Sequence, residues 1–343
     1  MLPRPSRALL AAALIAMAGG LSACASGAPA AVSSSSATAS GAASATPAAA
    51  ATVPVTSTSS SGTPRLMVQI SVGGGAPFTV MLDTGSTGLF VDESVVGPAV
   101  TSTGASYTEK YVDSSLQASL VQATVSIGGV ATAQPITLGL IDSSSASGLT
   151  SGAQGIMGVA PADGDWQSSG LLSPLVQLAA PYNEGFQLDV PASGSGTLAL
   201  GKPVAGQGTV STPLTALSSP PANVPGARFW DKDVNLCWTI ASLPQACGPT
   251  DLDTGAPASL LNSSVVTDVA SKDGILEPGQ PIAVATPDGA ALWSFQTGTT
   301  LGQDVATLEA LGAETSYNTG IAFYFGHVVG FDWADGQLLV TAK

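Results

Sequence analysis

Apolar and polar residues alternate along much of the chain with the period of two that is typical of β-strands. Val68, Ile70 and Val72 show the alternation first, and three glycines separate them from a second apolar run that ends at Asp83. Similar short runs, with Gly, Ser or Asn turns between them, recur at residues 123–127, 135–140, 197–200, 282–285, 291–295 and 321–329. The pattern predicts an all-β protein.

Two stretches have helical patterns instead, residues 171–179 and 259–271, and each follows a Gly or Pro breaker. The second half of the chain repeats the strand-and-turn arrangement of the first half. A boundary near residues 202–207 divides the two halves. We therefore expect an N-terminal lobe at residues 65–205 and a C-terminal lobe at residues 206–343.

The first residues have the pattern of an export signal. Arg4 and Arg7 precede an apolar segment that ends in Leu-Ser-Ala-Cys, with the cysteine at Cys24. This predicts a signal peptide at residues 1–23, and its ending resembles the bacterial lipobox. Cys24 is then the lipidated N-terminus, carrying palmitate and anchoring an exported protein to the bacterial cell membrane or envelope, facing outward. The alternative is an ordinary signal peptide followed by an incidental cysteine.

Residues 24–64 consist almost entirely of Ala, Ser, Thr, Pro and Gly after the cysteine. Such a segment has too few large apolar residues to fill a core. It predicts a disordered tether between the lipid anchor and the first lobe.

Composition removes several classes of function. The chain has 343 residues, with 9 Lys and Arg against 23 Asp and Glu, so nucleic acid is not an expected partner. Its one histidine, His327, excludes a histidine-rich metal site, and a Ser-His-Asp site would depend on that residue alone. We expect His327 to be packed or at a rim within its apolar run. The cofactor motifs are also missing, so we expect neither metal nor cofactor.

Cys237 and Cys247 are ten positions apart, a spacing that closes a small loop. In an exported protein this predicts a disulfide, with free buried thiols as the alternative.

The sequence Asp-Thr-Gly occurs twice, beginning at Asp83 and at Asp253. Phe-Thr-Val-Met-Leu leads into the first copy, and a shorter run leads into the second. Two carboxylates delivered by two similar substructures favour a dyad that shares one proton. Such a pair performs acid and base chemistry without a metal.

An ordered series of motifs over residues 65–343 resembles the pepsin-like aspartic protease family, in particular bacterial lipoprotein members of the actinobacterial type. The series comprises residues 78–87 for the first active-site loop, 155–158 for the apolar segment behind it, 173–175, 253–255 with 259–261 for the second loop, and 320–332 for the last core segment. The two cysteines also lie just before the second loop, where the family often has a disulfide.

The resemblance implies a bilobal fold of two β-barrel-like lobes, with the active-site cleft between them. It implies that Asp83 and Asp253 are catalytic and that the loops around them are supported by Thr84, Gly85, Ser86, Thr254 and Gly255. In the family the two threonines brace the opposite loop, and the two glycines offer N–H groups to the carboxylates. Ser86 would hydrogen-bond Asp83 from outside.

The family covers its substrate with a hairpin flap that carries a tyrosine. Counting back from the strand at residues 125–129 places Tyr111 at that position. Tyr107 is the second candidate, and a hairpin tyrosine without this role is the alternative.

The chain departs from the family pattern at three places. Phe90 stands where a tryptophan usually bonds the flap tyrosine, and Asn318-Thr319 is polar where two apolar residues are usual. Ala256-Pro257-Ala258 makes the second loop about two residues longer than usual. Ala256 supplies no hydroxyl to Asp253, which predicts a higher apparent pKa of the dyad and a less acidic pH optimum.

Together these features predict a monomeric aspartic endopeptidase that hydrolyses extended polypeptides at the cell envelope. The first alternative is a catalytically inactive pepsin-like module that binds its partner at the cell surface. The second, a solute-binding lipoprotein, predicts α/β halves, which the strand-rich pattern opposes.

Overall fold

The computed structural model describes residues 51–343 except residues 61, 112–114, 143–151, 163–165, 218, 220, 223 and 225. The predicted signal peptide, Cys24 and the tether as far as residue 50 lie outside these residues. In the described part strands dominate and helices are short, so the all-β fold class is confirmed. None of the helices described there has the length and apolar character needed to span a membrane.

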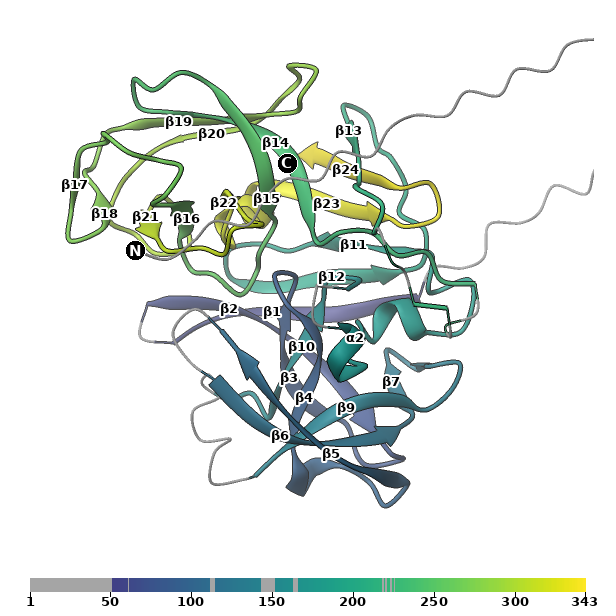
Figure 1. Ribbon diagram of the computed structural model, residues 1–343. Coiled ribbons are helices and arrows are strands. Elements are labelled where there is room, and N and C mark those ends of the chain that lie inside the picture. Colours follow the sequence, from purple (N-terminus) through teal and green to yellow (C-terminus); the bar gives the residue numbers. More distant parts are fainter. Residues whose placement is uncertain are drawn as a thin grey trace, which may run out of the picture. The chain divides into compact units, whose positions relative to one another are not determined.

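The larger of two sheets has 15 strands, drawn in Figure 1. They are β1 (Ala51–Ser60), β2 (Thr63–Val72), β3 (Phe78–Asp83), β4 (Thr87–Asp92), β5 (Val100–Lys110), β6 (Ser115–Ala123), β7 (Val125–Ile127), β8 (Val130–Ala131), β9 (Ile136–Ile141), β10 (Gly155–Val159), β11 (Gly185–Asp189), β12 (Gly194–Leu200), β13 (Val210–Pro213), β23 (His327–Asp332) and β24 (Gln337–Ala342). Their order is β13-β24-β23-β11-β12-β1-β2-β3-β10-β4-β9-β6-β5, and β7 pairs with β2 and β8.

The second sheet has nine strands in the order β17-β18-β21-β16-β22-β15-β14-β19-β20. Their bounds are β14 (Asp233–Ile240), β15 (Ala246–Asp251), β16 (Ser259–Asn262), β17 (Ser271–Lys272), β18 (Ile275–Leu276), β19 (Pro281–Ala285), β20 (Ala291–Gln296), β21 (Ala306–Glu309) and β22 (Tyr317–Asn318). The described helical segments are η1 (Glu93–Val95), α2 (Trp166–Ser169), η2 (Leu175–Gln177) and α3 (Ala322–Gly326).

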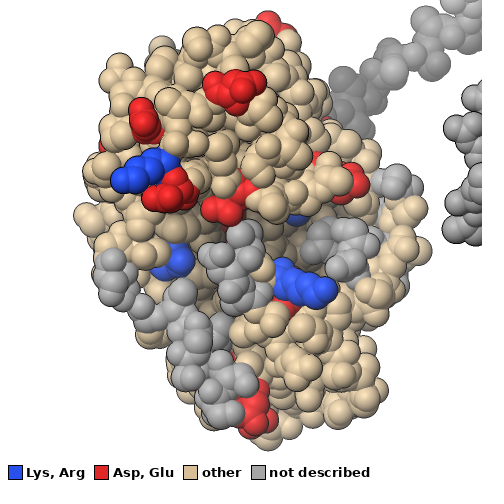
Figure 2. Space-filling view, turned by 60° about the vertical axis from the view of Figure 1, so that its left-hand side comes forward, with Lys and Arg blue, Asp and Glu red and all other residues tan. Residues whose placement is uncertain are grey.

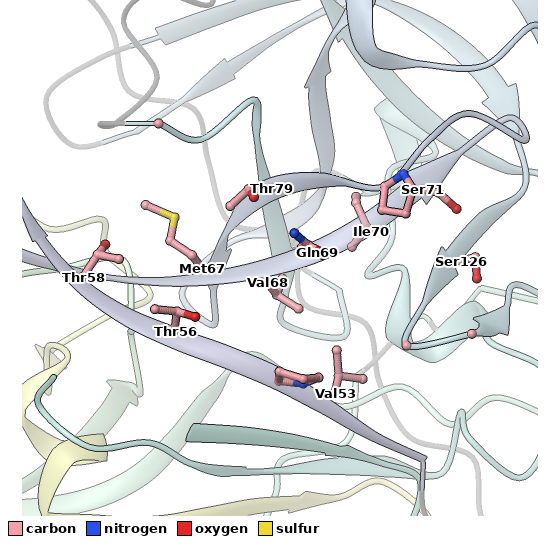
Figure 3. Close-up of a pocket in the computed structure, with 15 residues that line it drawn as sticks. Val53, Thr56, Thr58, Met67, Val68, Gln69, Ile70, Ser71, Thr79 and Ser126 are labelled. Atoms are coloured by element: carbon pink, nitrogen blue, oxygen red, sulfur yellow. The ribbon is translucent and has the colours of Figure 1, made fainter. Parts of the chain in front are cut away.

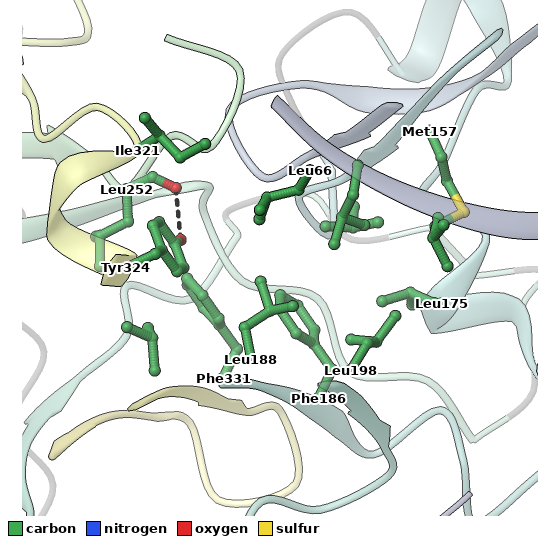
Figure 4. Close-up of a cluster of buried hydrophobic side chains, with 14 of the residues drawn as sticks. Leu66, Met157, Leu175, Phe186, Leu188, Leu198, Leu252, Ile321, Tyr324 and Phe331 are labelled. Atoms are coloured by element: carbon green, nitrogen blue, oxygen red, sulfur yellow. Dashed lines mark hydrogen bonds between the residues drawn. The ribbon is translucent and has the colours of Figure 1, made fainter. Parts of the chain in front are cut away.

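The sheets do not divide at residues 202–207, where the sequence predicts a lobe boundary. Three strands beyond that point, β13, β23 and β24, belong to the larger sheet, and β23 pairs directly with β11. Residues from both sheets also form one continuous cluster of buried hydrophobic side chains. Figure 4 shows part of it, with Leu66 and Leu188 near Leu252 and Tyr324. The two halves therefore share a core.

The predicted tether ends earlier than residue 64. Residues 51–60 form strand β1, which pairs with β12 on one side and with β2 on the other. Val53 and Val55 are buried beneath it, whereas the alternate Thr52 and Thr56 are exposed. Two buried valines in alternation and two paired edges give this Ser- and Thr-rich segment a place in the sheet.

The two predicted helices are not formed as such. Residues 171–179 contain only the short 3₁₀ turn η2, and residues 259–262 form strand β16. Tertiary pairing overrides the local pattern at β16, because this strand lies between β21 and β22 with Leu261 fully buried.

The disulfide predicted between Cys237 and Cys247 is present. The two cysteines are directly opposite each other in the antiparallel pair β14 and β15. His327 is packed, as expected: it is 4% exposed, its ring stacks on Phe323, and its nitrogens lie 2.7 and 3.0 Å from the carbonyl oxygens of Phe323 and Leu292.

Candidate active site

The two Asp-Thr-Gly loops occupy equivalent places in the two sheets. In each, a back strand runs parallel to the strand before the loop and antiparallel to the strand after it. The paired residues are Met81, Ile156 and Phe90 across β3, β10 and β4, and Asp251, Asn318 and Leu260 across β15, β22 and β16. The same number of residues lies between Met81 and Phe90 as between Asp251 and Leu260. The second loop, predicted to be lengthened, is thus as long as the first.

The threonines join the two loops. The Thr84 N–H donates to Thr254 Oγ1 at 3.0 Å, and the Thr254 N–H donates to Thr84 Oγ1 at 2.9 Å. Each hydroxyl then donates to a carbonyl of the opposite half, Thr84 to Leu252 and Thr254 to Leu82. All of these groups are buried, so the bonds fix the position of one loop against the other.

Asp83 and Asp253 meet across this junction. A Cβ on Gly85 would lie 2.4 Å from Asp253 Cγ, and one on Gly255 would lie 2.6 Å from Asp83 Oδ1. A side chain at either position would have to displace the facing carboxyl group, so glycine permits the carboxyl groups to approach each other as they do. Each glycine also donates its N–H to the aspartate of its own loop, Gly85 to Asp83 at 2.9 Å and Gly255 to Asp253 at 2.5 Å.

The second oxygen of each carboxylate has a different donor in the two halves. Ser86 Oγ donates to Asp83 Oδ2 at 2.6 Å. Ala256 offers no hydroxyl, but Asn318 Nδ2 donates to Asp253 Oδ2 at 2.8 Å. Ala256 thus supplies no hydroxyl, as the sequence indicates, and the second loop's missing donor is replaced by one from the back strand.

Burial and neighbouring charge act strongly on the first aspartate. Burial, followed by the charge of Asp253, raises the pKa of Asp83 to about 7, while Ser86 and Gly85 oppose the increase by hydrogen bonding. The two aspartates also interact electrostatically with Arg65 on β2. Burial lowers the pKa of Arg65, and the negative charges of Asp253 and Asp83 offset part of that decrease. Two close carboxyl groups with one proton between them are the arrangement needed for acid–base catalysis.

The raised pKa of Asp83 predicts a pH-dependent stability. The folded protein retains a proton on Asp83 that the unfolded chain releases near pH 4, so the free energy of unfolding falls as pH rises from about 4 to about 7. Asp83→Asn removes this contribution, which is on the order of 4 kcal/mol. Denaturant unfolding at both pH values measures it. Equal changes in wild type and variant would contradict the assignment.

Tyr111 directly follows β5, in the hairpin that β5 forms with β6. Burial raises the pKa of Tyr111, and the negative charge of Asp83 adds to the increase. Its hydroxyl has no hydrogen-bond partner among the described residues. Phe90, which replaces the usual tryptophan, offers no hydrogen bond and instead stacks on Tyr107 at 6.4 Å between ring centroids. Tyr107 and Tyr111 both pack against the Phe90 cluster.

Sequence reasoning missed several residues around the dyad. Tyr324 is fully buried, and its hydroxyl lies 2.8 Å from the Leu252 carbonyl, the bond drawn in Figure 4. Lys232 contacts Asp251 Oδ2 at 2.6 Å, immediately behind the second loop. The sequence offers one signal for such a residue. Asn318-Thr319 is polar where the family pattern has two apolar residues, which indicates that a side chain there contacts a polar group.

A cavity of about 760 Å³ lies elsewhere on the larger sheet. Figure 3 shows residues of β1, β2, β3 and β7 around it, including Thr56, Gln69, Thr79 and Ser126. Neither aspartate is in its lining, so the candidate active site is the dyad and not this cavity. The described residues contain no cluster of His, Cys, Asp and Glu arranged to hold a metal ion.

Two β-sheets joined by paired Asp-Thr-Gly loops define a protein of the aspartic peptidase class. The chain belongs to the family of PE-PGRS C-terminal aspartyl peptidase-like domains, which matches residues 51–334. Its fold is similar to that of the aspartic proteinase from Irpex lacteus, with a TM-score of 0.58 and 16% identity over 86% of this chain and 98% of that one. No curated protein sequence matches it. The pepsin-like family resemblance and bilobal fold class predicted from the sequence are confirmed.

Proposed function

We propose that the protein is an aspartic endopeptidase that hydrolyses peptide bonds of extended polypeptides. The observation that carries this proposal is that Asp83 and Asp253 meet at two glycines, where a Cβ would collide with the facing carboxyl group. The hydrogen bonds that hold each carboxylate leave the pair facing each other. Two adjacent carboxyl groups repel each other when both are charged, so they do not stabilise the fold as an ion pair would. A proton-sharing dyad, in contrast, requires them to be adjacent.

The chemistry follows from the shared proton. The charged carboxylate takes a proton from a water molecule, which attacks the carbonyl carbon of the peptide bond. The protonated carboxyl donates to the carbonyl oxygen as the tetrahedral intermediate forms. Proton return to the leaving nitrogen then breaks the C–N bond. The apparent pKa values belong to the pair, so activity is expected to fall above about pH 7, where both carboxyl groups become charged.

The hairpin of β5 and β6 is proposed to cover the substrate. β5 is the last strand of the larger sheet, and most of its residues are exposed. The negative charge of Asp83 contributes to the raised pKa of Tyr111, which supports a place for this hairpin over the dyad. A peptide held beneath it would bind as an additional strand, through backbone hydrogen bonds and side-chain pockets. Acidic side chains are scattered over the face drawn in Figure 2, and they outnumber basic ones in the whole chain, which argues against a nucleic acid as substrate.

We further propose that the enzyme is exported and acts as a monomer, anchored by a lipid on Cys24. The support is the sequence pattern of residues 1–23 and the lipobox-like ending at Cys24. Metabolic labelling with a palmitate analogue tests this in wild type and in Cys24→Ser. Label on both proteins, or on neither, would contradict it.

The function is tested by incubating the purified protein with a library of unstructured peptides between pH 3 and pH 8. We expect cleavage that pepstatin inhibits and that declines above about pH 7. A rate maximum near pH 2 would contradict the pKa assigned to Asp83. Absence of cleavage, combined with pepstatin binding, would favour the alternative of an inactive pepsin-like binding module.

A further inference from the structure

Asn318 occupies a position that is apolar in the other half of the molecule. Its counterpart by strand register is Ile156, because each residue lies on the back strand and faces the residue two before the aspartate. Ile156 offers the first aspartate no hydrogen bond, and Ser86 serves that role. In the second half Ala256 stands in the place of Ser86, and Asn318 in the place of Ile156.

The orientation of the Asn318 amide is fixed by a second contact. The backbone N–H of Gly320 donates to Asn318 Oδ1 at 2.8 Å. A backbone N–H can only donate, so the oxygen of the amide must face Gly320 and the NH₂ group must face Asp253. Gly320 in turn has φ of 64°, and a Cβ there would lie 2.4 Å from the Ala258 carbonyl oxygen. Asn318 is 5% exposed, so water does not replace this bond.

We propose that Asn318 is a positioning residue that holds the outer oxygen of Asp253, in place of the hydroxyl that the second loop lacks. This rests on the proposed peptidase function. The Asn318 contact also makes the two aspartates unequal in how they are hydrogen-bonded. The Ser86 hydroxyl can donate to an ionised carboxylate or accept from a protonated one, whereas an amide NH₂ only donates. Asn318 therefore favours the ionised form of Asp253 and places the shared proton towards Asp83.

The test is the pH–rate profile of Asn318→Leu, which keeps the approximate size of the side chain and removes the donor. Losing a hydrogen bond to the charged carboxylate disfavours ionisation, so the acidic limb of kcat/KM moves to higher pH by about one unit. Adding Ala256→Ser to this variant supplies a hydroxyl at the position equivalent to Ser86. We expect the double variant to return the limb towards its wild-type position.

Asn262→Leu is the matched control. Asn262 is also a buried asparagine of the second sheet, and its amide NH₂ donates to the Thr315 carbonyl at 2.8 Å without contacting the dyad. We expect this variant to lose stability and to keep the wild-type acidic limb. A wild-type limb in Asn318→Leu, or an equal shift in both variants, would overturn the role assigned to Asn318.

The same variants are compared by denaturant unfolding between pH 3 and pH 7, which detects ionisation of the pair without catalysis. If wild type cleaves no peptide but Asn318→Leu alone shifts this titration, the proposed function fails and the role of Asn318 stands. If wild type cleaves peptides and Asn318→Leu shifts neither the limb nor the titration, only the role of Asn318 fails.

Discussion

Asp83→Asn and Asp253→Asn are each expected to lower kcat/KM for peptide cleavage by about 10³-fold or more. Asparagine has the shape of aspartate and keeps an oxygen to accept the N–H of Gly85 or Gly255. It can neither take a proton from water nor hold the shared proton. Activity should therefore disappear while the fold persists, which circular dichroism and thermal unfolding would show.

Asp189→Asn serves as the control for this pair. The Asp189 side chain is 56% exposed and pairs with Lys343, away from the dyad. Asp189→Asn removes one aspartate carboxylate, as the two test variants do, but leaves the dyad and its hydrogen bonds unchanged. Wild-type cleavage is expected. Cleavage by Asp83→Asn or Asp253→Asn within tenfold of wild type would contradict the assignment of that aspartate to catalysis.

Gly85→Ala is expected to lower kcat/KM by about 100-fold, through crowding alone. Gly85 does not have a positive φ, so alanine fits its backbone conformation. Its methyl group would meet Asp253 Cγ at 2.4 Å, however, and Asp253 is held in place by bonds from Gly255 and Asn318. The carboxylate must move out of alignment with Asp83, and such displacements strongly reduce catalysis.

Gly312→Ala is the corresponding control, because a Cβ at Gly312 meets no atom within 4 Å and the backbone has no positive φ. Its kcat/KM should equal that of wild type. Both variants are assayed with the same peptide at the same folded fraction. Wild-type activity in Gly85→Ala would show that the carboxyl groups do not need the close approach.

The repeated Asp-Thr-Gly could be interpreted from sequence because each copy is local. A strand, an aspartate and two small residues follow one another along the chain, so the pattern itself predicts a loop that presents a carboxylate. That Thr84 and Thr254 brace opposite loops came from the family resemblance. The hydrogen bonds between Thr84 and Thr254 show how each threonine contacts the opposite loop.

Other parts depend on partners that are distant in sequence. The Ala, Ser and Thr content of residues 51–60 predicts a tether, and only pairing with β12 and β2 turns the segment into a strand. Asn318 follows Asp253 by 65 positions, and the register of β22 against β15 decides that its amide reaches the carboxylate. Local patterns contain no information on register across a sheet, so neither feature was predicted.

The most direct test of the central claim, that Asp83 and Asp253 act as one unit, is kcat/KM of the double variant Asp83→Asn/Asp253→Asn. If the two carboxyl groups share one proton and one water molecule, removing the first already removes the mechanism. The double variant should then be no slower than either single variant, within about threefold. Losses that multiply, with each aspartate contributing its own factor, would contradict a shared dyad.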